Sequence, residues 1–387
     1  MKKSIVMIPM LLLLVACGDE DERTGQEKSY DVSLPEVAEI LSELPLGLDQ
    51  MHEVYDAVSV SSTNGYDEEY TMRDLFVSPG RGVGEEATKA SARTYGTPLR
   101  DLIRDYLASA PKTRSGPSPD EVLAALSGSS AQIYWPYSAE WDGSETLPVI
   151  TFDPGVDVSA NTGYQIEVDA AGNRTVKEVI VDENMARSRP VWVINENEDS
   201  GYTSLEMLRR RDPDWGRGGS IVVKSGSDAS DLKMLLLKNF TMKRQYDSWF
   251  RGASEFFVKC GSVANFRAST EAELKLYSPS ITDFMITVKR NQVGEKIPFD
   301  AILVSDWTEQ LETVAFMITE DDGGTRTSWK LNATVKVSSK AYGIEIELPY
   351  RANDDIVWRG ALSYGFFKKY DGTTQHFGDV DLTFSIE

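Results

Sequence analysis

The hydrophobic period of this chain changes from near four to two at about residue 130. Before that point, apolar residues recur at helical spacing, as in Val37, Ile40, Leu41 and Leu44. After it, short segments such as VKEVIVDE and PVWVIN alternate and are separated by turn residues, which is typical of strands. A period near four predicts helices and a period of two predicts strands. The chain is therefore predicted to be α+β, with short helices followed by strands.

The predicted helices begin at recognisable start signals. Ser33 and Glu36 have the spacing of a capping box, and the same pattern returns at Ser118 and Glu121. Pro98 stands at the first position of another apolar stripe, where its missing N–H costs no hydrogen bond. Residues 33–127 are therefore predicted to form several short helices joined by Gly and Pro loops.

The rest of the chain is predicted to contain two kinds of β structure. Residues 130–225 mix short strands with one helix at TSLEMLRRRD, and Gly172-Asn173 is a hairpin signal. Residues 232–387 carry seven or eight alternating segments without a long helical pattern, which predicts an antiparallel β-sandwich. The polar stretch 226–231 is the predicted boundary between the two.

The first residues resemble a secretion signal. Lys2 and Lys3 precede an apolar run that is too short for a membrane span, and Leu14-Val15-Ala16-Cys17 follows it. This order resembles the lipobox of bacterial lipoproteins, and the acidic run 19–22 resembles the tether of surface-exported lipoproteins of the Bacteroidota type. The resemblance implies a lipid on Cys17 and an outer-membrane location facing outward. A plain signal peptide with a chance cysteine, or a short membrane anchor, is the alternative.

Four segments follow from these patterns. They are a signal peptide at 1–16, a lipidated acidic tether at 17–32, a helical then mixed α/β domain at 33–228, and a β-sandwich domain at 229–387. Once Cys17 carries lipid, Cys260 has no disulfide partner. Its apolar surroundings predict a buried, inert thiol.

The charge balance excludes one class of partner. The chain has 61 acidic against 40 basic residues and a net charge of −21. Nucleic acid phosphates would repel such a chain, and no basic stripe with interleaved aromatic residues interrupts it. We therefore expect no nucleic acid partner.

The common catalytic motifs are missing from the sequence. It contains no G-x-S-x-G elbow, no H-E-x-x-H helix and no phosphate loop, and its two histidines are His52 and His376. A pair of carboxylates could still hydrolyse glycosides, but among so many acidic residues the sequence does not indicate which pair.

Acidic loops in the β-rich half suggest a calcium site. Calcium takes six to eight oxygen ligands, and loops at one end of a sandwich can supply them. The predicted ligands are Asp321, Asp322, Asp354, Asp355 and Asp379. The alternative is that these residues only form turns, because no EF-hand spacing is present. Calcium is the only cofactor that the sequence suggests.

A dense aromatic segment suggests a ligand-binding surface. Tyr134, Trp135, Tyr137 and Trp141 lie close together in IYWPYSAEWDG. Rings with polar tips suit stacking on sugars or packing against a protein partner. Alternation into the core is the competing interpretation.

These observations favour a non-catalytic surface lipoprotein that binds an extracellular glycan, peptide or surface protein. This inference depends on the location, the missing catalytic motifs and an analogy with other sandwich folds. The alternatives are an extracellular hydrolase that uses carboxylates, and a structural or adhesive component of a surface assembly.

Overall fold

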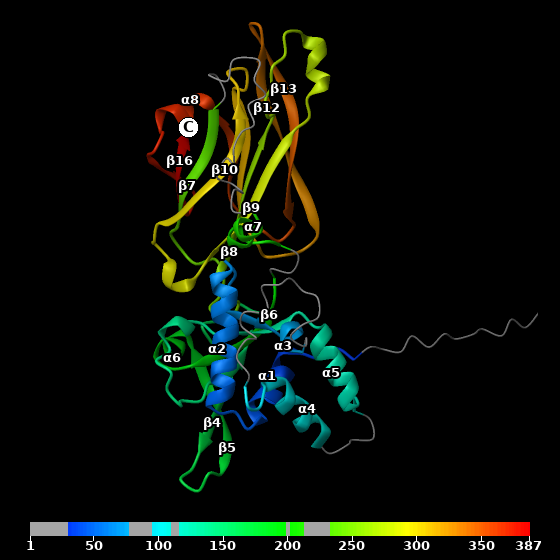
Figure 1. Ribbon diagram of the computed structural model, residues 1–387, viewed down its shortest axis with the longest axis vertical. Coiled ribbons are helices and arrows are strands. Elements are labelled where there is room, and N and C mark those ends of the chain that lie inside the picture. The colour runs from blue at the N-terminus through cyan, green and yellow to red at the C-terminus, as the bar shows by residue number, and fades with distance from the viewer. Residues whose placement is uncertain (1–29, 77–94, 110–115, 199–201, 213–232) are drawn as a thin grey trace, which may run out of the picture.

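The computed structural model describes residues 30–76, 95–109, 116–198, 202–212 and 233–387. Helices lie mostly in the N-terminal part and antiparallel sheets in the C-terminal part, so the predicted α+β class with a sandwich is confirmed. The two parts stack along the long axis of the molecule (Figure 1). The predicted leader, residues 17–29 of the predicted tether including Cys17, and the boundary at 226–231 lie outside the described residues. Residues 30–32 of the predicted tether are described, and Val32 is buried in the core of the N-terminal part.

The N-terminal part is built on a six-stranded sheet in the order β1-β2-β6-β3-β4-β5. Strands β3 and β6 pair in parallel and the other neighbours pair antiparallel. The strands are β1 (Glu69–Thr71), β2 (Ala131–Tyr134), β3 (Val149–Phe152), β4 (Ala160–Val168), β5 (Arg174–Asp182) and β6 (Val191–Glu196). As predicted, β4 and β5 form a hairpin around Gly172-Asn173, and it projects away from the sandwich (Figure 1).

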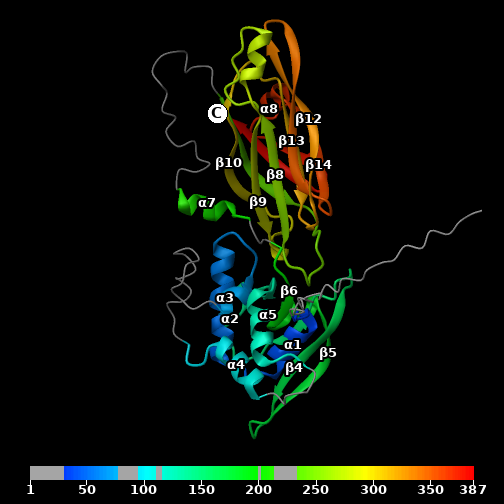
Figure 2. The same ribbon diagram turned by 90° about the vertical axis from the view of Figure 1, so that its right-hand side faces the viewer.

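Helices cover one face of this sheet (Figure 2). Trp135, Trp192 and Ile194 point into a core that they share with apolar residues of the helices, such as Leu41 and Met51. The helices of this part are α1 (Leu34–Glu43), α2 (Leu48–Thr63), α3 (Met72–Phe76), α4 (Leu99–Ser109), α5 (Pro119–Gly128) and α6 (Glu183–Ser188). These helices cover that face except for α6, whose Ala186 packs on the opposite face with Val191 and Val193 of β6.

The two predicted capping boxes have different outcomes. At Ser118 the hydroxyl accepts from Glu121 N at 3.3 Å and Glu121 Oε2 accepts from Ser118 N at 2.6 Å, so this box is confirmed. At Ser33 the helix begins as predicted, but the side chain makes no cap hydrogen bond. The carboxylate of Glu36 accepts from the Tyr30 hydroxyl instead, so the predicted box there is wrong.

The C-terminal part is a sandwich of two four-stranded sheets, β10-β7-β16-β15 and β14-β11-β8-β9. Their facing sides enclose a core with large aromatic side chains, among them Phe240, Phe256, Phe316 and Phe384. The strands are β7 (Lys233–Met242), β8 (Ser254–Ser262), β9 (Ser280–Val288), β10 (Ile297–Trp307), β11 (Thr313–Glu320), β14 (Asp355–Ser363), β15 (Thr374–Phe377) and β16 (Val380–Ile386).

A hairpin of β12 (Arg326–Val337) and β13 (Lys340–Arg351) adds a third layer. Its Ala333, Ile346 and Leu348 pack on Ala315 and Met317 of β11. Both faces of β11 are therefore covered, and residues on both sides of this strand are buried. This hairpin brings the described strands of the C-terminal part to ten, more than the predicted seven or eight.

Short helices complete the described structure. Leu205 of α7 (Leu205–Arg211) belongs to the sandwich core, although its sequence lies on the N-terminal side of the predicted boundary. The others are α8 (Tyr364–Lys369) and the 3-10 helices Ser138–Glu140, Glu271–Leu276 and Arg290–Gln292. Within the described ranges, every helix is too short or too polar to cross a membrane.

Candidate functional site

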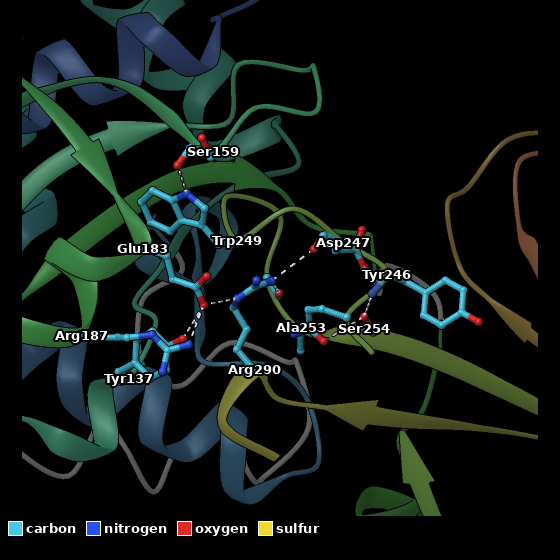
Figure 3. A network of polar contacts seen from close by, with 12 residues as sticks. Tyr137, Ser159, Glu183, Arg187, Tyr246, Asp247, Trp249, Ala253, Ser254 and Arg290 are labelled. Atoms are coloured by element: carbon cyan, nitrogen blue, oxygen red, sulfur yellow. Dashed lines mark hydrogen bonds and ion pairs between the residues drawn. The ribbon is translucent and has the colours of Figure 1, made fainter. Parts of the chain in front are cut away.

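The loop between β7 and β8, residues 243–253, joins the two parts of the molecule; we call it the junction loop. It places Trp249 and Phe250 on the face of the N-terminal sheet opposite α1 to α5, beside Ala186 of α6. There they pack against Val149, Val191 and Val193, and Trp249 Nε1 donates to Ser159 O at 3.1 Å (Figure 3). A loop of the C-terminal part thus completes the core of the N-terminal part.

Polar contacts hold the backbone of the junction loop. The buried amide of Asn195 donates to Phe250 O at 3.1 Å and to Arg251 O at 2.6 Å. Asp67 Oδ2 accepts from Ala253 N at 2.9 Å. Gly252 has a φ of 126°, and a Cβ there would lie 2.5 Å from Asp67 Oδ2, so this close approach requires glycine.

Arg290 bridges both parts and the junction loop. Its Nε lies 2.9 Å from Glu183 Oε1 of α6, and its Nη1 donates to Asp247 O at 3.2 Å (Figure 3). Glu183 Oε1 also accepts from Tyr137 Oη at 2.5 Å and Arg187 Nη2 at 3.0 Å. Burial opposes ionisation of Glu183, but the hydrogen bonds from Arg290 and Tyr137 outweigh it and lower its pKa.

Three carboxylates converge where the junction loop enters the sandwich. Asp247 lies in the loop, Glu255 near the start of β8, and Glu320 at the end of β11. One carboxylate oxygen from each lies within 4.8 Å of those of the other two. We call these residues the carboxylate trio; in the described part of the chain, no other group of acidic, histidine or cysteine side chains has this geometry.

The carboxylate trio is removed from solvent. The exposed fractions are 0% for Glu320, 7% for Asp247 and 8% for Glu255. Both carboxylate oxygens of Glu320 and Oδ2 of Asp247 are buried without a hydrogen-bond partner outside the trio, and the Asp247 and Glu320 side chains contact each other. Burial raises the pKa of Glu320, and the neighbouring Asp247 and Asp322 raise it further; burial raises the pKa of Asp247 as well. The site therefore favours a state in which its negative charge is reduced, by protons or by a cation.

Four of the five predicted calcium ligands lie beside the trio, at the same end of the sheet. Asp321 pairs with Arg351 Nη1 at 3.2 Å, and Asp354 Oδ2 accepts from Arg351 N at 2.7 Å. Asp322 lies 3.7 Å from Arg251 Nη1, and Asp355 opposes Glu320 across the β11–β14 pair. Asp321 and Asp322 are thus partly neutralised by arginine side chains.

The fifth predicted ligand has different partners. Asp379 Oδ2 pairs with Arg244 Nε at 2.6 Å and accepts from Tyr246 Oη at 3.1 Å. Asp379 follows β15 in the other sheet and forms an ion pair on the surface there. Sequence reasoning named Glu320 only as part of an acidic loop and missed Asp247 and Glu255 as site residues.

The aromatic segment is not an open stacking surface. Tyr134, Trp135 and Tyr137 are exposed by 5% or less: Trp135 lies in the core under the helices, and Tyr134 and Tyr137 lie in the core on the opposite face of the sheet. The prediction that these rings stack on a ligand is corrected for this reason. Trp141 is half-buried, and its ring lies 5.1 Å from those of His52 and Tyr55.

The histidines and the remaining cysteine do not form a nucleophilic site. His52 packs on Trp141, and the exposed His376 pairs with Asp381 at 2.8 Å. Cys260 is fully buried, and burial raises the pKa of its thiol, so the predicted buried thiol is confirmed. A thiol held in its protonated form is a poor nucleophile.

The geometry of the carboxylate trio separates two kinds of chemistry. Glycoside hydrolysis needs two carboxyl groups about 5 to 9.5 Å apart, on either side of a sugar that enters from solvent. The trio has carboxylate oxygens within 4.8 Å of one another and is buried among protein atoms, where a sugar has no access. It offers oxygen ligands without nitrogen or sulfur, the ligand type that calcium takes.

Comparison of the chain with protein-family models, with curated proteins and with solved structures finds no match. The functional interpretation therefore depends on the site itself.

Proposed function

We propose that this protein is a non-catalytic surface lipoprotein that binds an extracellular partner. One observation carries the proposal: the convergent carboxylates are buried in the junction between the two parts, where a polymer substrate has no access. This geometry argues against hydrolysis of a glycoside by a pair of carboxylates. The junction instead serves to hold a helical sheet and a sandwich together as one binding molecule.

Among partners, the surface favours a protein or peptide. The aromatic rings that would stack on a sugar are buried, whereas aliphatic side chains are exposed on the projecting β4–β5 hairpin. Ile180 is 68% exposed and Val168 is 52% exposed, and β5 is the edge strand of the described sheet. An edge strand can pair with an extended segment of another chain.

The lipid anchor is testable by itself. We expect the mature protein to begin at Cys17 and to carry fatty acyl groups there, because the leader has the lipobox order. Mass spectrometry of the protein from its native membrane measures this. An intact leader, or an unmodified amino terminus, would contradict the anchor.

The binding proposal is tested by presenting the purified protein to arrays of glycans and of extracellular peptides, with and without calcium. We expect saturable binding to an array member, and no release of reducing sugar from any bound glycan. Turnover that is lost in Glu320→Gln would overturn the proposal in favour of a hydrolase. Silence on both arrays would overturn it in favour of a structural component of a surface assembly.

A further inference from the structure

In the described part of the chain, neither Asp247 nor Glu320 of the carboxylate trio forms an ion pair with a basic side chain. The charges of Arg251 and Arg290 act on Asp247, but both guanidinium groups are paired with other carboxylates: Arg251 lies 3.6 Å from Asp153 and 3.7 Å from Asp322, and Arg290 pairs with Glu183. Several carboxylates close together in a dry interior repel one another strongly. Either protons or a bound cation must relieve this repulsion.

Unpartnered oxygens favour a bound cation over protons as the source of the positive charge. Apart from the contact that the Asp247 and Glu320 side chains make with each other, both oxygens of Glu320 and one of Asp247 lack a hydrogen-bond partner although they are fully buried. Buried polar atoms without a partner are uncommon, and an absent ion is one of their ordinary explanations. One carboxylate oxygen each of Glu320 and Asp247 lies within 4.8 Å of a carboxylate oxygen of Glu255.

The distances fit a calcium ion. Calcium binds oxygen at about 2.3 to 2.6 Å, so two oxygens on one ion lie at most about 5 Å apart. The ligand oxygens of the trio lie within 4.8 Å of one another. Magnesium binds at about 2.0 to 2.1 Å and retains several waters, which suits a buried site less well. Zinc prefers nitrogen and sulfur ligands, which the trio does not offer.

We propose that Asp247, Glu255 and Glu320 bind one calcium ion that fastens the junction loop to the sandwich. Asp247 belongs to the loop, whereas Glu255 and Glu320 belong to neighbouring strands of one sheet. The ion therefore ties a segment that carries Trp249 and Phe250 into the N-terminal core. This site goes beyond the proposed partner binding, because it acts within the molecule.

Calorimetric titration of the chelator-treated full-length protein with calcium chloride tests the site. We expect one calcium per chain, and at least tenfold weaker binding in Glu320→Gln and in Asp247→Asn. Asp379→Asn is the matched control: it removes an aspartate that pairs with Arg244, so its affinity should equal that of the wild type. Magnesium chloride alone should bind at least tenfold more weakly than calcium.

Thermal unfolding gives a second readout that does not depend on the heat of binding. Calcium should raise the Tm of the wild type and of Asp379→Asn, because an ion that binds only the folded state stabilises it. In chelator, Glu320→Gln should melt at or above the wild-type Tm, since it carries one buried charge less. No binding by the wild type, or equal affinity in wild type, Glu320→Gln and Asp247→Asn, would overturn the proposal. Equal affinity would place any calcium at other residues.

Discussion

Replacing Phe250 by alanine is expected to lower the free energy of unfolding by about 3 to 5 kcal/mol, the usual cost of emptying a buried phenylalanine site. Phe250 is 0% exposed, and its ring lies 4.0 Å from that of Trp249 between residues of the N-terminal sheet. Because this ring comes from the C-terminal part, its loss should also weaken the coupling between the two parts. Urea unfolding followed by circular dichroism measures the first effect.

Hydrogen exchange measures the second effect. In Phe250→Ala, amides of the junction loop and of β6 should exchange faster than those of β8 and β11. Phe240→Ala is the matched control, since Phe240 is equally buried but lies within the sandwich core. It should lose similar stability while the junction loop keeps its protection relative to β8. Equal exchange patterns in the two variants would contradict a joining role for the loop.

Replacing Arg290 by methionine is expected to cost about 3 kcal/mol, because breaking a buried ion pair leaves a desolvated charge and unpaired acceptors. Arg290 is 11% exposed at its side chain, and it supports both Glu183 and the carbonyl of Asp247. Arg187 is the matched control. It bonds to the same Glu183 oxygen but is 53% exposed, so Arg187→Met should cost about 1 kcal/mol or less.

The effect of Arg290→Met should depend on pH with a defined sign. Arg290 keeps the pKa of Glu183 below its ordinary value. The pair therefore stabilises the protein at every pH above the ordinary pKa of a glutamate, and this stabilisation is lost in strong acid, where Glu183 is protonated. The difference in unfolding free energy between wild type and variant should therefore be full at pH 7 and shrink as the pH falls below about 4.5. A difference that stays constant down to pH 3 would show that the guanidinium acts only through packing.

The local patterns of the sequence predict most of the elements. The helical stripes at 33–44 and 99–107 and the alternating strands at 329–337 and 344–348 are present, because each buries one face against a larger layer. Strand β1 has only three residues and gives no periodic signal. The β12–β13 hairpin was predicted as strands, but its role as a third layer depends on distant contacts with β11.

The candidate site was predictable only in part. The aspartate clusters at 321–322 and 354–355 suggest a cation site from the sequence alone, and the structure places both clusters at one end of one sheet. Asp247 and Glu255 are single acids in an aromatic loop and an apolar strand, so nothing local marks them as a pair. Their meeting with Glu320 results from the pairing of β8 with β11, which local periodicity does not specify. Burial of the aromatic segment likewise depends on which layers cover the two faces of β2.

The most direct test of the calcium-fastened junction is anomalous diffraction from crystals of the protein soaked in calcium chloride. We expect one strong anomalous peak, surrounded by carboxylate oxygens of Asp247, Glu255 and Glu320 at about 2.3 to 2.6 Å. Carboxyl groups of the trio in direct hydrogen-bonding contact with one another, with no anomalous peak between them, would contradict it.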